Sequence, residues 1–191
     1  MDMMALKERL VRDGWPAESV FALEFEDPVG SSEDHATELE QMLWAALART
    51  GAGEVDIVAH SMGGLAVWSL LEKRGGSLPI NRAVFLATPF QGTVTAYLAW
   101  GPGGPEMIPG SEFLQNLQSH GWPRRWVNAL AIRTPLDFTV VPGEGATMLG
   151  VPDRVICCPT HQGLLDHEDT FAAVRNFLLF GRRVEEHPTE R

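Results

Sequence analysis

The chain has 191 residues, 45% hydrophobic and 21% charged, and its 15 basic and 25 acidic side chains give a net charge of −10. This length suits one compact domain. The mean hydropathy of −0.06 excludes a disordered or fibrous chain. A pI near 5.0 argues against a basic face for nucleic acid and against a polybasic membrane anchor. We therefore expect no nucleic-acid partner and, because no long apolar run occurs, no membrane span. We also expect a monomer.

The first half of the chain alternates between expected helices and strands. Apolar spacing predicts a helix from Met3 that Gly14 closes, and the apolar run 20–25 predicts a strand. Ser31 or Ser32 is expected to cap a second helix that ends at Gly51. A strand over 55–59 and a helix over 62–73 follow.

The second half continues this alternation around one long loop. Strands are expected over 83–87, 129–133 and 154–158, and helices over 111–119 and at the end of the chain, where Phe171, Val174 and Leu178 form the buried side. Residues 88–110, rich in Gly and Pro, are expected to form a loop, a possible lid or pocket wall, with a helical turn near 96–100. Residues 182–191 are expected to be a disordered tail.

The alternation predicts one α/β domain over residues 1–191, with a mostly parallel sheet between two helical layers. Functional residues of such sheets gather at the carboxyl ends of the strands.

Two cysteines stand side by side at positions 157 and 158. They are too few for a disulfide framework or a zinc site. We expect both to be small apolar residues in a buried strand.

The segment Ala59–Gly64 joins an expected strand to an expected helix and has the form of a nucleophile elbow. The turn would hold Ser61 in strained geometry, with the small residues Ala59 and Gly63 relieving crowding; His60 and Gly64 complete the elbow. The backbone N–H of Met62 would then face a developing oxyanion. The alternative interpretation is a small-residue turn that contains an ordinary serine.

A serine nucleophile needs a histidine base and a group that orients this base. On an α/β sheet of this kind the chain order is serine, acid, histidine. Asp137 follows the strand 129–133, and His161 follows the strand 154–158. Asp137 could instead be a turn or helix cap, and the rival acids Asp153, Asp166 and Glu144 are less well placed.

The other histidines are less suitable as the base. The side chain of His60 should point elsewhere in the elbow, because it adjoins the serine. His167 competes with His161 but is expected at the start of the last helix. Three more lie in segments expected to be solvated: His35, His120 and His187.

The chain resembles the α/β-hydrolase superfamily, and most closely the small bacterial lipases and esterases. The resemblance is carried by Val55–Gly64, and by Ala87–Thr93, which is similar to a Thr-Pro-x-x-Gly-Thr/Ser signature of lipases. It implies hydrolysis of a carboxylic ester, with Ser61 as nucleophile, His161 as base and Asp137 as the residue that holds the imidazolium. It implies a small ester or lipid substrate and no metal or organic cofactor.

The sequence does not decide which residues form the acyl pocket. Trp100, Met107 and Ile108 could line an acyl pocket or form a small lid, or they could simply cover the core. A thioesterase, an amidase or an acyltransferase would use the same three residues, because the pocket rather than the triad selects the leaving group.

The sequence departs from the resembled family at its start. Family members place a strand ending in His-Gly before the first helix, between the strands that correspond to 20–25 and 55–59, and its loop supplies a second oxyanion donor. We expect either a start that is too late for a complete enzyme or a degenerate hydrolase-fold protein with weak or no catalysis. The first hypothesis is favoured, because Ser61, Asp137 and His161 are all present. The expected location is the cytoplasm for the chain as it stands, or outside the cell if an upstream segment was lost.

Overall fold

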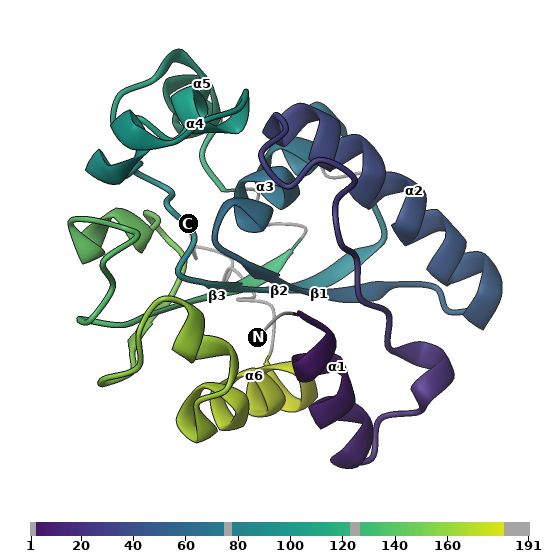
Figure 1. The fold of residues 1–191 in the computed structure, drawn as a ribbon. Helices are drawn as coiled ribbons and strands as arrows, with labels where there is room; N and C mark the ends of the chain where they lie inside the picture. Colours follow the sequence, from purple (N-terminus) through teal and green to yellow (C-terminus); the bar gives the residue numbers. More distant parts are fainter. Residues whose placement is uncertain (1–2, 75–77, 123–126, 182–191) are drawn as a thin grey trace, which may run out of the picture.

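The computed structural model describes residues 3–74, 78–122 and 127–181, so the expected tail at 182–191 lies outside the described residues. The chain forms three layers, with helices on both faces of a central sheet (Figure 1). In these described parts, no helix is long and apolar enough to cross a membrane.

The sheet has four parallel strands in the order β1-β2-β3-β4. The strands are β1 (Val55–His60), β2 (Ile80–Leu86), β3 (Asn128–Arg133) and β4 (Asp153–Val155). The register places His60 opposite Leu86, so β1 and β2 end at the same level. The predicted α/β class with a parallel sheet is confirmed, and the carboxyl ends of the strands lie along one edge.

The helices divide between the two faces of the sheet. Helices α2 (Ser32–Thr50), α3 (Met62–Arg74) and α5 (Glu112–His120) lie on one face, and α1 (Met3–Arg12) and α6 (Glu168–Phe180) on the other (Figure 1). The shorter helices are η1 (Ala17–Ser19), η2 (Val94–Leu98), α4 (Gly103–Glu106), η3 (Gly143–Ala146) and η4 (Gln162–Leu165). Ser31 caps α2 by accepting a hydrogen bond from the N–H of Asp34, and Gly51 ends it in the left-handed conformation.

Two apolar clusters fill the spaces between sheet and helices. Alternate residues of β2 contribute to each cluster, Ala83 and Phe85 on the side of α3, and Val84 and Leu86 on the side of α6. All four are fully buried. The part of β2 that is covered on both faces is therefore continuously apolar, and this apolar run is the feature from which the sequence predicted a strand.

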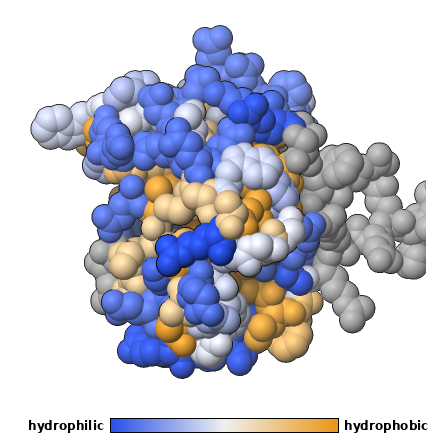
Figure 2. Space-filling view, turned by 90° about the vertical axis from the view of Figure 1, so that its right-hand side faces the viewer, coloured by the Kyte–Doolittle hydropathy of each residue, from blue (hydrophilic) through white to orange (hydrophobic). Residues whose placement is uncertain are grey.

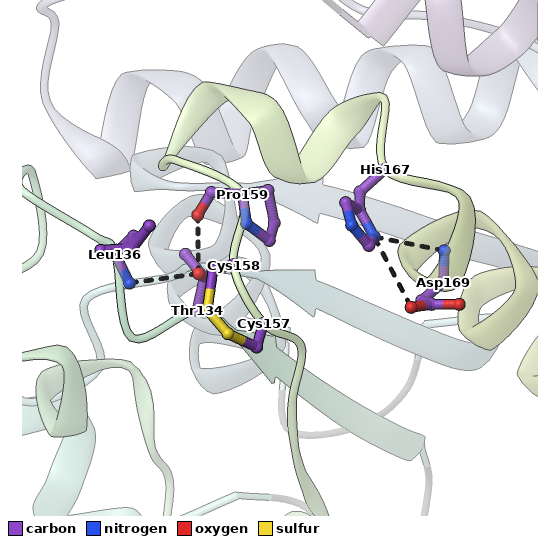
Figure 3. The surroundings of a disulfide bond; sticks show 7 residues. All are labelled: Thr134, Leu136, Cys157, Cys158, Pro159, His167 and Asp169. Atoms are coloured by element: carbon purple, nitrogen blue, oxygen red, sulfur yellow. Dashed lines mark hydrogen bonds and ion pairs between the residues drawn. A yellow bond between two sulfur atoms is a disulfide. The ribbon is translucent and has the colours of Figure 1, made fainter.

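Two of the expected strands differ from the structure. Residues 20–25 form no strand and lie outside the sheet, because no described strand pairs with them. β4 ends at Val155, so Cys157 and Cys158 lie in the following loop, where both are exposed. The expectation of two buried strand cysteines is wrong: the pair forms a disulfide between neighbours (Figure 3).

A groove of about 890 Å³ separates residues 20–25 from β1. Its walls include apolar side chains of α1 and α2, among them Leu6, Leu10, Leu39 and Leu43. On the groove side, β1 has no strand partner among the described residues. Figure 2 shows this side of the molecule, where apolar surface is exposed across the middle of the face. Within the described parts of the chain, β1 thus has no neighbouring strand between itself and residues 20–25, where the resembled family places one.

Candidate functional site

The turn between β1 and α3 holds Ser61 in a conformation that is rare for residues other than glycine. Its φ is +53°, in the left-handed region. The N–H of Ser61 donates to the carbonyl of Leu86 at 2.8 Å, which ties the turn to the end of β2. Met62 is the first residue of α3, so its N–H has no partner within the helix. The serine therefore lies at the positive end of a helix, beside a backbone donor that has no intrahelical partner.

The two glycines after Met62 differ in what they permit. A β-carbon at Gly64 would lie 2.0 Å from Oγ1 of Thr88, so the helix can approach this side chain only with glycine there. At Gly63 the nearest atom is a ring carbon of Phe25 at 3.8 Å, an ordinary contact. The close approach is therefore at Gly64, and the expected crowding at Gly63 is not found.

Asp137 and His161 form a buried pair. Nδ1 of His161 lies 2.8 Å from Oδ2 of Asp137, and the two side chains are 6% and 2% exposed. Oδ1 of Asp137 accepts two further hydrogen bonds of 2.8 Å, from the N–H groups of Thr139 and Val140. Both carboxylate oxygens of Asp137 thus accept hydrogen bonds. In this pair Nδ1 of His161 carries the proton and donates it.

The pKa of Asp137 reflects two opposing effects. Burial raises this pKa, but the hydrogen bonds from His161, Val140 and Thr139 and the charge of the imidazole together lower it below its ordinary value. The carboxylate is therefore ionised at neutral pH, as a group that stabilises an imidazolium must be.

Two contacts join the loops that carry Asp137 and His161. The buried hydroxyl of Thr134 donates to the carbonyl of Pro159 at 2.6 Å and accepts from the N–H of Leu136 at 3.3 Å (Figure 3). An isolated parallel bridge pairs Leu136 with Thr160. The residues just before Asp137 and just before His161 are thereby held side by side.

Thr93, in the Thr-Pro-x-x-Gly-Thr segment, holds the other side of the Asp137 loop. Its buried hydroxyl donates to the carbonyl of Thr139 and accepts from the N–H of Val141, both at 2.8 Å. The sequence singled out this segment but gave Thr93 no role. No sequence signal gave this role, because the partners of Thr93 lie 46 and 48 residues further along the chain.

His60 points toward His161, contrary to the expectation that it would point elsewhere. Its Nε2 lies 3.1 Å from the carbonyl oxygen of His161, and the two ring centroids are 4.6 Å apart. Because His60 directly precedes Ser61, this contact brings the elbow and the His161 loop to one end of the sheet. The structure contains no hydrogen bond between Ser61 and His161.

The remaining histidines lie away from the Asp137 carboxylate. His167 caps α6, where its Nδ1 accepts from the N–H of Asp169 (Figure 3). His35 is fully buried rather than solvated, stacked on Phe25 with ring centroids 3.9 Å apart. His120 is exposed at the end of α5, as expected, and His187 lies outside the described residues.

The rival acids also lie away from the Asp137–His161 pair. Asp153 pairs with Arg133, and Asp166 and Glu144 lie in or beside short helices.

Within residues 88–110, Trp100 is 86% exposed whereas Met107 packs against the core, and neither lines the groove. Whether this segment acts as a lid remains a prediction.

Comparisons with known proteins agree with this architecture. Residues 24–111 match the family described as alpha/beta hydrolase fold. That stretch includes Ser61 and the elbow but neither Asp137 nor His161. Over 102 residues the chain is 33% identical to phospholipase A(1) LCAT3 of Arabidopsis thaliana. The matched stretch covers 51% of this chain and 21% of that protein.

Solved structures show the same fold. Lipase B of Aspergillus fumigatus superposes with a TM-score of 0.71 at 17% identity, over 82% of this chain and 44% of the lipase. The mature lipase BlEst2 of Bacillus licheniformis superposes with a TM-score of 0.67 at 15% identity, over 80% of this chain and 76% of the lipase. The predicted resemblance to the α/β hydrolases is therefore confirmed. The chain spans about a fifth of the curated relative and under half of lipase B.

Proposed function

From the α/β-hydrolase fold and its likeness to lipases, we propose that the chain is a serine hydrolase that cleaves carboxylic esters. The observation that carries the proposal is the buried Asp137–His161 pair, which lies at the same end of the sheet as the strained turn of Ser61. A lone buried carboxylate or imidazole is costly, but an oriented pair beside an activated serine is the usual arrangement for acyl transfer.

The proposed reaction has two halves. Oγ of Ser61 attacks the ester carbonyl while Nε2 of His161 takes the hydroxyl proton, and the oxyanion is bound by the N–H of Met62. His161 then gives this proton to the departing alcohol, which leaves an acyl-enzyme. Water, deprotonated by His161, attacks the acyl carbon in the second half, which releases the acid and restores Ser61.

The hydrogen bond from Ser61 to His161 would have to form on substrate binding. Such bonds are often long or unformed without substrate, so this geometry does not oppose the proposal. Asp137 fixes the Nδ1–H tautomer of His161, which leaves Nε2 free for the serine hydroxyl.

The groove beside β1 is a poor candidate for the acyl pocket. One wall is the unpaired backbone edge of β1, and an acyl chain offers that edge no hydrogen-bond partner. The substrate's acyl length, and the choice among ester, thioester and amide, therefore remain for a substrate panel to decide.

A second candidate is a hydrolase-fold protein with weak or no catalysis, and the open groove favours it. The groove lies beside Ser61 and Met62, where the resembled family places a second oxyanion donor. Loss of one such donor costs about 100- to 1000-fold in rate. Turnover at the rate of an efficient esterase that depends on Ser61 would agree with the first candidate, whereas turnover slower by this factor, or none at all, would favour the second.

The test is hydrolysis of p-nitrophenyl butyrate by the wild type and matched variants. Ser61→Ala should abolish turnover, whereas Ser119→Ala, a change at an exposed serine of α5, should not alter it. His161→Ala should abolish it, and His167→Ala should retain it. Turnover that survives Ser61→Ala would refute Ser61 as the nucleophile.

A further inference from the structure

His60 makes two contacts with His161 that the proposed reaction does not itself require. Its Nε2 lies 3.1 Å from the carbonyl oxygen of His161, and its ring packs against the other imidazole at 4.6 Å with a tilt of 49°. The two residues are 101 positions apart in the chain. The contact therefore links the strand that carries Ser61 directly to the loop that carries His161.

The direction of this hydrogen bond follows from its partner. A carbonyl oxygen only accepts, so Nε2 of His60 must carry a proton and donate it. The His161 residue is then held at two points, by Asp137 at its ring Nδ1 and by His60 at its main chain. Two fixed points define how the imidazole faces the end of β1, whereas one would leave it free to pivot.

His60 is uncharged at neutral pH. The pKa of His60 is lowered from 6.5 to about 4, mainly by burial and secondly by the charge of His161. The hydrogen bond to His161 and the charge of Asp137 raise this pKa by smaller amounts. The titratable groups that face His60 are His161 and Asp137. A neutral ring beside His161 matters, because a second positive charge there would oppose protonation of the base.

We infer that His60 is a positioning residue for His161. The N–H and the ring of His60 hold His161 in the orientation needed to accept the proton of Ser61. The inference rests on the proposed function for its catalytic meaning, but the contact itself can be measured without catalysis. His60 does not touch the substrate in this role. It acts through the loop of His161.

Two variants separate the hydrogen bond from simple filling of space. His60→Phe keeps a ring of similar size and removes the N–H, whereas His60→Gln keeps a donor of similar reach and removes the ring. If His60→Phe does not fold, His60→Asn replaces it, since the shorter amide remains polar but does not reach the carbonyl.

The first measurement is kcat and KM for p-nitrophenyl butyrate. His60→Phe is expected to lower kcat about 10- to 100-fold with little change in KM, because displacement of a catalytic group by about 1 Å costs rate on this scale. His60→Gln should recover most of the loss. Wild-type kcat in His60→Phe, or equal losses in both variants, would overturn the inference.

The second measurement is the proton resonance of His161 Nδ1–H by NMR, which requires no activity. It should persist in wild type and His60→Gln, and broaden or disappear in His60→Phe as the ring loses its fixed orientation. An unchanged resonance in His60→Phe would overturn the inference. If Ser61→Ala leaves ester turnover unchanged, the proposed function fails, while this resonance still decides whether His60 positions His161.

Discussion

The hydroxyl of Thr134 donates a 2.6 Å hydrogen bond to the carbonyl of Pro159 and so joins the loop of Asp137 to the loop of His161. Thr134 itself is fully buried. Thr134→Val preserves the shape and removes the hydroxyl, which leaves the carbonyl of Pro159 and the N–H of Leu136 without this partner. We expect a loss of about 1–3 kcal/mol in the free energy of unfolding and a lower kcat. Denaturant unfolding and ester assays measure both, and Thr134→Ser, which keeps the hydroxyl, should retain most of each.

Asp137→Asn should leave the fold intact and abolish most of the ester hydrolysis. An amide in place of the carboxylate favours the wrong tautomer of His161, and in the serine protease type case this change costs on the order of 10⁴-fold in kcat. The control is Asp153→Asn, which alters an acid paired with Arg133 away from the site. Equal activity of the two variants would contradict the assignment of Asp137.

Replacement of the two elbow glycines by alanine should affect stability to different degrees. Gly64→Ala places a β-carbon 2.0 Å from Oγ1 and 2.8 Å from Cβ of Thr88, so we expect a loss of about 1–3 kcal/mol or more in stability. Gly63→Ala meets only Phe25 at 3.8 Å and should leave the melting temperature close to that of the wild type. A thermal melt of each variant decides, and destabilisation by Gly63→Ala alone would contradict the geometry.

Stability should fall between pH 6.5 and pH 4 partly because of His60. Its pKa is about 4 in the folded chain and 6.5 in the unfolded chain, so between these values the unfolded state binds more protons. The free energy of unfolding then decreases as pH falls, by up to about 1.4 kcal/mol per pH unit for one group. Urea unfolding at pH 7 and pH 5 should show a smaller loss for His60→Phe than for the wild type. The lowered pKa of Asp137 affects stability only at lower pH, because its contribution is lost as pH falls through the folded value.

The amide groups of β1 should exchange with solvent at alternating rates. The N–H of Ser61 donates to Leu86 in β2, so by the two-residue period of a strand the amides of Ile57 and Ala59 also face β2. Those of Val58 and His60 face the groove, where no described strand accepts from them. Hydrogen exchange should therefore be faster at Val58 and His60. Uniform protection along β1 would show that this edge is covered.

Much of the site could be predicted because its residues follow strand ends in chain order. The sequence proposed Ser61, Asp137 and His161 largely from that order, and the structure brings Asp137 and His161 into contact. The hydrogen bonds of Thr134 and Thr93 join residues 25 to 48 positions apart, and no local pattern reveals such partners.

The errors have equally specific physical causes. The apolar run predicts a strand over residues 20–25, but a strand also needs a paired neighbour, and pairing is not a local property. The direction of His60 was missed for a similar reason, since the carbonyl that it contacts belongs to a loop 101 residues away.

The edge of β1 that no described strand covers also affects how this chain meets other polypeptides. Unpaired backbone groups on a strand are a template for any extended segment, from another copy of the chain or from a different protein. A segment that aligned with this edge would run along the groove that Ser61 and Met62 line. Self-association through this edge and access of substrate to the serine would therefore compete for the same place, so turnover per molecule should depend on protein concentration.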